Sequence, residues 1–299
     1  MIQRKNPLLS ALLFVLITLG GFAQNEKETL KVMSYNIWNG FEWGKDTERK
    51  ANCIEWIKSK KPDVVALQEL CGYDEQMLKE DALKWGHQYV QLLKTEGYPT
   101  GLTSNRPVEL VERKLDSFWH GMLHCKTYGI DFYVVHLSPA DAKFRLREAK
   151  MIVQDIQKNQ SDNYVILGDF NANSPFDAYA LEKNNGLREK YRPKSDAKHS
   201  NLLNGNFDYS VIGQFLACPA VDLALNKVDM VTQGYTYPTP GLVGKYNNTD
   251  KSIVANRVRI DYIFASPNLA NTCKAFNIFN QQETHGLSDH YPVMAEFGL

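Results

Sequence analysis

Short apolar runs separated by polar and turn-forming residues fill most of the chain and predict many short strands. Two segments instead space their apolar residues by three and four, which is typical of helices; one runs from Thr47 to Lys60 and the other follows Asp141. Ser174 and Pro175 are also typical of a helix start. Strands are expected over residues 30–37, 64–67, 89–93, 119–126, 130–137, 164–167, 258–264, 274–279 and 291–297.

The balance of elements favours an α/β (α+β) fold in which two mixed β-sheets pack face to face with helices on the outside. Strands outnumber helices, and many neighbouring strands have no helical segment between them, which argues against a purely parallel sheet. Because the chain shows no internal repeat, low-complexity tract or Pro/Gly/Ser-rich linker, we expect one domain over residues 28–299. Residues 194–257 are polar, aromatic and irregular, as expected of a functional loop region.

Residues 1–23 differ from the rest and have the pattern of a secretory signal peptide. Two basic residues are followed by an apolar run over 8–19 and then by small residues, so we expect cleavage before Gln24 and a secreted or periplasmic mature protein. The apolar run is shorter than the ~20 residues that a membrane-spanning helix needs. We therefore expect no transmembrane segment in the mature chain.

The charge balance disfavours a long polyanion as the ligand of this protein. The sequence has 34 Lys+Arg and 34 Asp+Glu residues; without Arg4 and Lys5 of the leader, 34 − 2 = 32 basic residues remain against 34 acidic ones, a formal charge of −2. Proteins that bind nucleic acids usually carry a basic excess. No run of basic residues flanks the polar strand ends described below.

The cysteines are widely spaced, odd in number and free of the paired spacing that zinc sites use. We expect them to be buried thiols, with one disulfide after export as the alternative. The five positions are Cys53, Cys71, Cys125, Cys218 and Cys273.

Polar residues interrupt the ends of several predicted strands, where side chains commonly point into a cleft. Taken singly, each has an ordinary structural explanation, such as a cap, an Asx turn or a core histidine. Taken together they favour a site, because several buried carboxylates need a cation or a charged histidine to balance them. The positions are Asn36, Glu69, His136, Asp169, Asn171, Asp261, Asp289 and His290.

The order of these motifs along the chain resembles the endonuclease/exonuclease/phosphatase superfamily over nearly all of the mature sequence. GDFNAN and SDHYPV are the specific motifs, whereas Ser-Tyr-Asn or Gln-Glu alone is weak. The resemblance implies a four-layer sandwich and a metal-dependent phosphoric ester hydrolase. The matching segments are residues 34–36 (SYN), 68–69 (QE), 101–107 (GLTSNRP), His136, 168–173 (GDFNAN), 259–264 (RIDYIF) and 288–293 (SDHYPV).

The resemblance also implies a metal site. Glu69 corresponds to the principal Mg²⁺ ligand, with Asn36 beside it. Asp289 corresponds either to a metal ligand or to a carboxylate that contacts the metal ligands. Hard divalent cations prefer such oxygen ligands, and Mn²⁺ is the alternative metal.

The remaining motif residues are similar to groups that handle water and phosphate. Asp169 resembles the residue that positions and deprotonates the attacking water, and Asn171 the donor to the phosphoryl oxygens. His290 resembles a phosphate-contacting histidine with Asp261 as its carboxylate partner. His136 matches the position that contacts the phosphate from the side opposite His290. Phosphoryl transfer needs this kind of positioning and charge stabilisation.

Other functions remain as alternatives. A non-catalytic binding module on the same fold is disfavoured because the catalytic set is complete, and a zinc hydrolase of another fold because no close His-x-x-x-His spacing occurs. The RIDYIF and GDFNAN motifs depart from those of phosphoinositide phosphatases, which disfavours that activity. We expect a monomeric enzyme that acts on a small or lipid-type phosphoester, with a secreted nuclease as the alternative. Trp38 and Trp43 either bind the substrate by stacking or simply pack.

Overall fold

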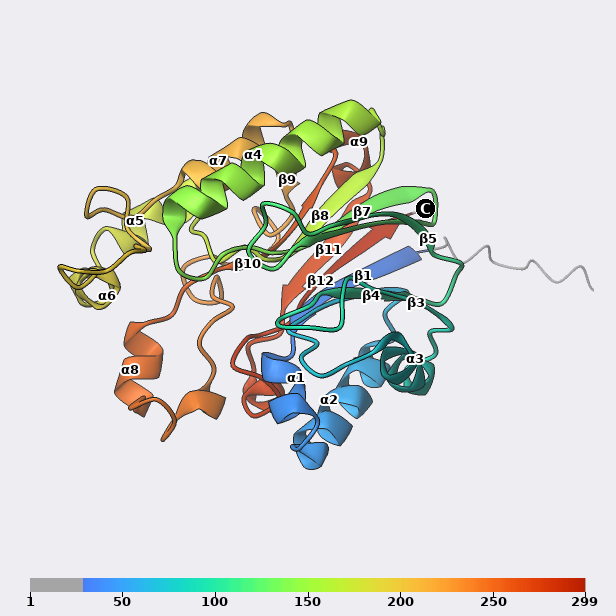
Figure 1. The fold of residues 1–299 in the computed structure, drawn as a ribbon, viewed down its shortest axis with the longest axis horizontal. Coiled ribbons are helices and arrows are strands. Elements are labelled where there is room, and N and C mark those ends of the chain that lie inside the picture. Colours follow the sequence, from blue (N-terminus) through green and yellow to red (C-terminus); the bar gives the residue numbers. More distant parts are fainter. Residues whose placement is uncertain (1–28, 299) are drawn as a thin grey trace, which may run out of the picture.

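The computed structural model describes residues 29–298 as two six-stranded sheets packed face to face (Figure 1). The predicted signal peptide over 1–23 and its cleavage site lie outside the described residues. In spatial order the first sheet consists of β11 (Cys273–Ile278), β12 (Val293–Gly298), β1 (Thr29–Asn36), β2 (Val64–Gln68), β4 (Gly101–Ser104) and β3 (Tyr89–Leu92). The second consists of β5 (Glu109–Lys114), β6 (Met122–Thr127), β7 (Ile130–His136), β8 (Tyr164–Asp169), β10 (Asp261–Ala265) and β9 (Val221–Asp222).

Both sheets are mixed, as the sequence predicts. The pairs β1–β2 and β7–β8 are parallel, and the other pairs within the described chain are antiparallel. Successive side chains on a strand point to opposite faces. In β1, Val32 therefore packs between the sheets while Met33 packs under the helices, and Val64 and Val65 of β2 divide in the same way.

Helices cover the outer face of each sheet and complete four layers (Figure 1). The apolar faces of α2 (Thr47–Lys60) and α3 (Glu75–Lys84) pack on the first sheet, and those of α4 (Ala142–Asn159) and α7 (Ser210–Ala217) on the second. The shorter helical segments are α1 (Trp38–Trp43), η1 (Pro175–Asp177), α5 (Ala178–Leu181), α6 (Asn185–Tyr191), η2 (Pro240–Leu242), α8 (Asp250–Ala255), α9 (Pro267–Ala270) and η3 (Gln282–Thr284).

Most predicted elements are present, and the exceptions have physical causes. Helix α2 has the predicted bounds, and Asp141 caps α4 by accepting a hydrogen bond from the Phe144 amide. Strand β5 was not predicted because it is a charged, mostly exposed edge strand. Residues 194–257 are less irregular than expected, since they contain α7, which has only eight residues and is therefore too short for its apolar spacing to stand out in the sequence.

The cysteines agree with the expectation of buried thiols. All five cysteines are free; four are buried and Cys273 is half-buried. Among the helices of residues 29–298, none combines the length and the hydrophobicity needed to cross a bilayer.

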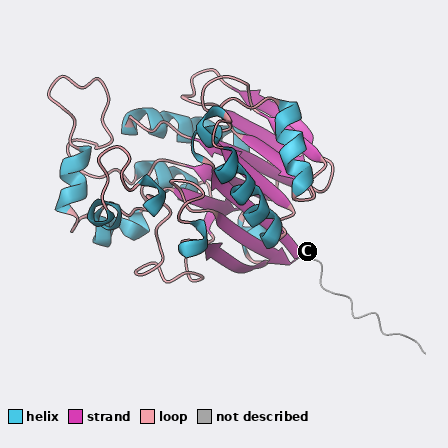
Figure 2. Ribbon diagram, turned by 90° about the horizontal axis from the view of Figure 1, so that it is seen from below, coloured by secondary structure: helices cyan, strands magenta, loops and turns pink. Residues whose placement is uncertain are grey.

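Strand register brings the polar strand ends together at one end of the sandwich. His136 of β7 lies opposite Asp169 of β8, which lies opposite Asp261 of β10. Long loops and short helices gather at one end of the strands (Figure 2). Gly168 is required here because a Cβ atom at this position would lie 1.9 Å from the Val135 carbonyl oxygen. The tight β7–β8 contact thus fixes the position of Asp169.

Candidate active site

Asp169 is the centre of the polar cluster and is 2 % exposed. Its Oδ2 accepts a hydrogen bond from Asn36 Nδ2 at 3.1 Å and lies 3.5 Å from His136 Nε2 and 3.7 Å from His290 Nε2. Its Oδ1 accepts from the Asn171 amide at 2.9 Å. Burial, together with the charges of Asp261 and Glu69, raises the pKa of the Asp169 carboxyl despite His290. A buried carboxylate of raised pKa can accept a proton from water.

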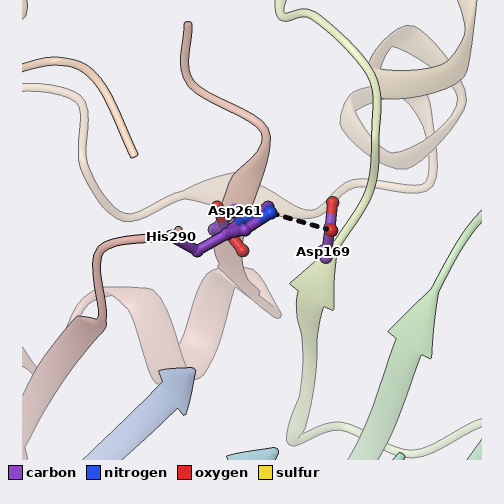
Figure 3. A group of neighbouring side chains, drawn as sticks. All are labelled: Asp169, Asp261 and His290. Atoms are coloured by element: carbon purple, nitrogen blue, oxygen red, sulfur yellow. Dashed lines mark hydrogen bonds and ion pairs between the residues drawn. The ribbon is translucent and has the colours of Figure 1, made fainter. Parts of the chain in front are cut away.

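His290 is held between two carboxylates (Figure 3). Its Nδ1 lies 2.9 Å from Asp261 Oδ2, and its Nε2 faces Asp169. Burial alone lowers the pKa of His290, but Asp261 and then Asp169 more than offset this and hold the pKa well above its usual value. His290 is therefore a cation whose Nε2–H points toward Asp169.

A loop before β10 fixes the two segments that carry this pair. Thr236 Oγ1 accepts hydrogen bonds from the amides of Ile260 and Asp261, and the Thr239 hydroxyl donates to the Ser288 carbonyl. Ser288 in turn donates from its hydroxyl to the Asn36 carbonyl at 2.6 Å. The end of β1, the start of β10 and the Ser-Asp-His segment are thus locked into one frame.

Glu69 and Asp289 provide carboxylate oxygens beside this frame. Glu69 has a left-handed backbone, with φ 60°, and accepts from Asn36 Nδ2 at 3.2 Å and from the Asn39 amide at 2.7 Å. Burial and the nearby charge of Glu69 raise the pKa of Asp289, against the effect of His290. The Asn36 Oδ1 accepts from the Trp38 amide at 3.1 Å.

The charges around this cluster fit a bound divalent cation. Glu69, Asp169, Asp261 and Asp289 are four carboxylates, and His290 is the one cationic side chain hydrogen-bonded to a member of this set within residues 29–298. Such an excess of buried negative charge requires a positive ion, and carboxylate oxygens are the ligands that hard divalent cations prefer.

Two places in the cluster can offer ligand atoms to a metal ion. Asp169, Asp261 and His290 each bring one within 4.8 Å of the others. An ion there would have to replace the close His290–Asp261 contact, whereas Glu69 and Asp289 face the pocket without such a pairing. The Glu69–Asp289 side is therefore the better oxygen site.

A pocket of about 560 Å³ opens above the cluster. We call the predicted residues that line its base the floor; these are Glu69, His136, Asp169, Asn171, Asp289 and His290. Asn36 and Asp261 lie behind the floor and act on it through hydrogen bonds.

The structure separates the two tryptophans that were expected to contact substrate. Trp38 is 7 % exposed and lines the pocket, as predicted for a contact residue. Trp43 is 54 % exposed and does not line the pocket. The reason is the left-handed turn of α1, which carries Trp43 away so that its ring packs edge-on to Tyr98, with centroids 6.3 Å apart.

Several pocket residues were not singled out from the sequence, and most of them form what we call the wall. They occur in loops and on helices without a recognisable motif, although Arg145 repeats with Ala142 and Ala149 on the buried face of α4, a pattern that could have identified it. The wall consists of Tyr98, Trp119, Arg145, Lys190, Tyr191, Asn201, Tyr237 and Tyr246.

His120 also lines the pocket and was missed. Its ring stacks on His136 with centroids 4.3 Å apart. Burial and the positive charge of Lys94 lower the pKa of His120 to about 4, and burial with His120 holds the pKa of His136 well below its usual value. Both rings are therefore neutral near pH 7, unlike His290.

Comparisons with known proteins agree with this fold. A structure of an AP endonuclease from Archaeoglobus fulgidus superposes with a TM-score of 0.68, at 20% identity, over 90% of this chain and 100% of the other. The 3′-5′ exonuclease NExo from Neisseria meningitidis gives 0.64 at 20% identity over 90% and 100%. Humanized D. rerio TDP2 gives 0.57 at 17% identity over 91% and 99%.

Sequence comparison identifies the family. A search of curated proteins gives no match. The model of the endonuclease/exonuclease/phosphatase family, by contrast, matches residues 33–290, which include every floor residue and all the motifs except the last three residues of SDHYPV. The chain therefore belongs to the endonuclease/exonuclease/phosphatase family and is a metal-dependent phosphoric ester hydrolase.

Proposed function

We propose that this hydrolase is exported and cleaves a small or lipid-type phosphoester. The observation that carries the proposal is the pocket: its volume of about 560 Å³ is in the range that holds one small ligand. Aromatic and polar side chains of the wall surround the floor, so a substrate phosphate reaches Asp169 only by entering the pocket. Export rests on the sequence of residues 1–23.

The floor performs hydrolysis by in-line attack of water. Asp169 orients the attacking water and takes its proton, because its carboxylate is buried and its pKa is raised. Cationic His290, held by Asp261, donates from Nε2 to a phosphoryl oxygen, and His136 contacts the phosphate from the opposite side. Asn171 donates from its amide side chain to another phosphoryl oxygen; in the structure that group meets the Leu137 carbonyl at 3.1 Å.

A divalent cation, for which we propose Mg²⁺ with Mn²⁺ as the alternative, would be held by Glu69 and Asp289, with Asn36 beside them. When bound, it supplies Lewis-acid stabilisation of the charge that develops on the phosphate and leaving oxygens. Asn36 orients Glu69 and Asp169 through its Nδ2.

A secreted nuclease is the second candidate. Two of the similar structures are named as an AP endonuclease and a 3′-5′ exonuclease, so this fold can carry a nuclease active site. The formal charge of −2 over the predicted mature chain gives no general attraction to a polyanion, which favours the small substrate.

A direct comparison of substrates tests the proposal. The mature enzyme is assayed with Mg²⁺ at physiological salt on plasmid DNA, single-stranded DNA and RNA, and on sphingomyelin, glycerophosphodiesters and sugar phosphates. We expect the highest kcat/KM on a small or lipid-type substrate. A higher kcat/KM on any nucleic acid than on every small or lipid substrate would establish the nuclease instead.

A further inference from the structure

Two cationic side chains lie in the wall, away from the carboxylates of the floor. Arg145 projects from α4 and is 4 % exposed, and Lys190 projects from the end of α6 at the rim. Arg145 Nη1 donates to the Ser138 carbonyl and to Asn201 Oδ1, both at 2.7 Å. Its buried Nε has no hydrogen-bond partner within residues 29–298. The guanidinium is thus fixed at the pocket with donor capacity unused.

Neither cation is neutralised by a carboxylate at contact distance. No ion pair among the residues that the structure describes includes Arg145 or Lys190. Asp208 and Glu148 lie near enough to favour the charge of Arg145, but burial outweighs them and lowers its pKa. Partial burial alone lowers the pKa of Lys190. Leaving the buried positive charge of Arg145 without a partner is unfavourable, and an anionic ligand group would relieve it.

The two cations are close to the reacting end of the pocket. Arg145 and Lys190 line the same pocket as Asp169 and His290, and its volume of about 560 Å³ is in the range that holds one small ligand. A single small molecule can therefore contact both the wall cations and the floor.

We propose that Arg145 and Lys190, with Asn201, form a second anion subsite that binds a phosphate or carboxylate group elsewhere on the substrate. This inference rests on the proposed function and narrows its substrate class. The enzyme would favour phosphoesters that carry two anionic groups, and would disfavour those with a cationic head group such as choline, which the wall cations repel.

The test uses p-nitrophenyl phosphodiesters that differ only in their second alcohol. The alcohols are methanol, 3-hydroxypropionate, ethylene glycol monophosphate and choline, so the added group is neutral, carboxylate, phosphate or cationic. We expect kcat/KM to rise roughly tenfold from the methyl diester to the better of the two anionic diesters, mainly through KM, and to be lowest for choline. The carboxylate and phosphate arms show which anion the subsite prefers.

Lys190→Gln tests the subsite with little risk to folding, because Lys190 is exposed. It should lower the ratio of kcat/KM for the anionic diester to kcat/KM for the methyl diester by about threefold or more. Lys194→Gln is the matched control, since Lys194 is exposed in the following loop and does not line the pocket. Arg145→Lys should reduce the preference further by removing the fork of donors, with thermal melting as the check on folding.

Equilibrium binding separates failure of the subsite from failure of the proposed function. Titration calorimetry compares ethyl phosphate with ethylene glycol bisphosphate in wild type and Lys190→Gln, with Mg²⁺ present. Tighter binding of the bisphosphate that is lost in Lys190→Gln supports the subsite even if no diester is hydrolysed. Equal binding of both, or equal effects of Lys190→Gln and Lys194→Gln, would overturn it even if the methyl diester is a good substrate.

Discussion

The floor and the wall of the pocket hold their side chains in different ways. Floor residues lie at strand ends, in the turns directly after them or, for Asp289 and His290, just before β12. Hydrogen bonds or ion pairs tie Asp169, Glu69 and His290 to one another or to the frame behind them. In the wall, Lys190 and Tyr246 make no side-chain hydrogen bond within residues 29–298, and Tyr246 is 74 % exposed. The floor is rigid because the sheets fix it, whereas the wall, apart from Arg145 on the long helix α4, depends largely on loops and short helices.

The difference separates chemistry from specificity. The floor needs groups placed to within a fraction of an ångström of each other, which packed strands provide. The wall needs only to present groups that suit one substrate, and loops can change without disturbing the sheets. We therefore expect changes in the floor to lower kcat and changes in the wall to alter KM.

Removing the metal should have the largest effect, because it leaves the carboxylates of the floor without a counter-ion. Exhaustive chelation followed by dialysis should abolish hydrolysis of any substrate, and Mg²⁺ or Mn²⁺ should restore it. Circular dichroism before and after chelation checks that the fold persists. Full activity in the metal-free protein would show that the floor works without the cation.

Asp169→Asn and His290→Ala should each lower kcat by roughly 10²-fold or more, because each removes a group that handles the proton or stabilises charge. Asp261→Asn should have a comparable or smaller effect, since Asp261 acts through His290. Steady-state kinetics on folded, purified variants measures this. Near-wild-type kcat in either of the first two variants would contradict the assignment of the floor.

The floor was predictable from the sequence because its residues adjoin apolar strands in short motifs. Asp169 and His290 stand in GDFNAN and SDHYPV, and the strands that carry Asn36, His136 and Asp261 were predicted within a few residues. Strand register then places His136 and Asp261 on either side of Asp169.

The wall was not predictable in the same way. Lys190 stands at the end of the short helix α6 and Tyr246 lies in a loop, and the course of both segments depends on tertiary contacts rather than on a local pattern. Of the two alternatives for Trp43, the structure shows packing: the residue follows Asn36 closely in sequence, but it lies outside the pocket with its ring against Tyr98. Proximity in sequence to a motif therefore does not place a residue in the site.

His120, which lines the pocket and stacks on His136, should make stability depend on pH. Its pKa is about 4 in the folded protein and about 6.5 when unfolded. Since the folded-state pKa is depressed, the contribution of His120 is fully present above pH 6.5 and is lost as the pH falls toward 4, to the extent of about 3 kcal/mol.

Urea unfolding at several pH values measures this loss. His120→Phe keeps an aromatic ring beside His136 but cannot titrate, so its free energy of unfolding should fall less between pH 6.5 and 4.5. Equal slopes for wild type and His120→Phe would show that His120 is protonated in the folded protein.

Exchanging the two tryptophans for smaller residues should give the smallest effects and the sharpest test of the pocket boundary. Trp43→Ala should leave kcat/KM within about twofold of wild type and lower the free energy of unfolding by about 1 kcal/mol, because it removes one edge-on aromatic contact at an exposed site.

Trp38→Phe, by contrast, should raise KM about threefold with kcat nearly unchanged, because Trp38 lines the pocket beside Glu69. Phe is used there because Trp38 is buried, and removing its whole ring would leave a cavity and unfold part of the population. The comparison rests on the boundary between Trp38 inside the pocket and Trp43 outside it. A larger rise in KM for Trp43→Ala than for Trp38→Phe, measured on the same substrate, would mean that the substrate extends over α1, and the wall would then have to include that turn.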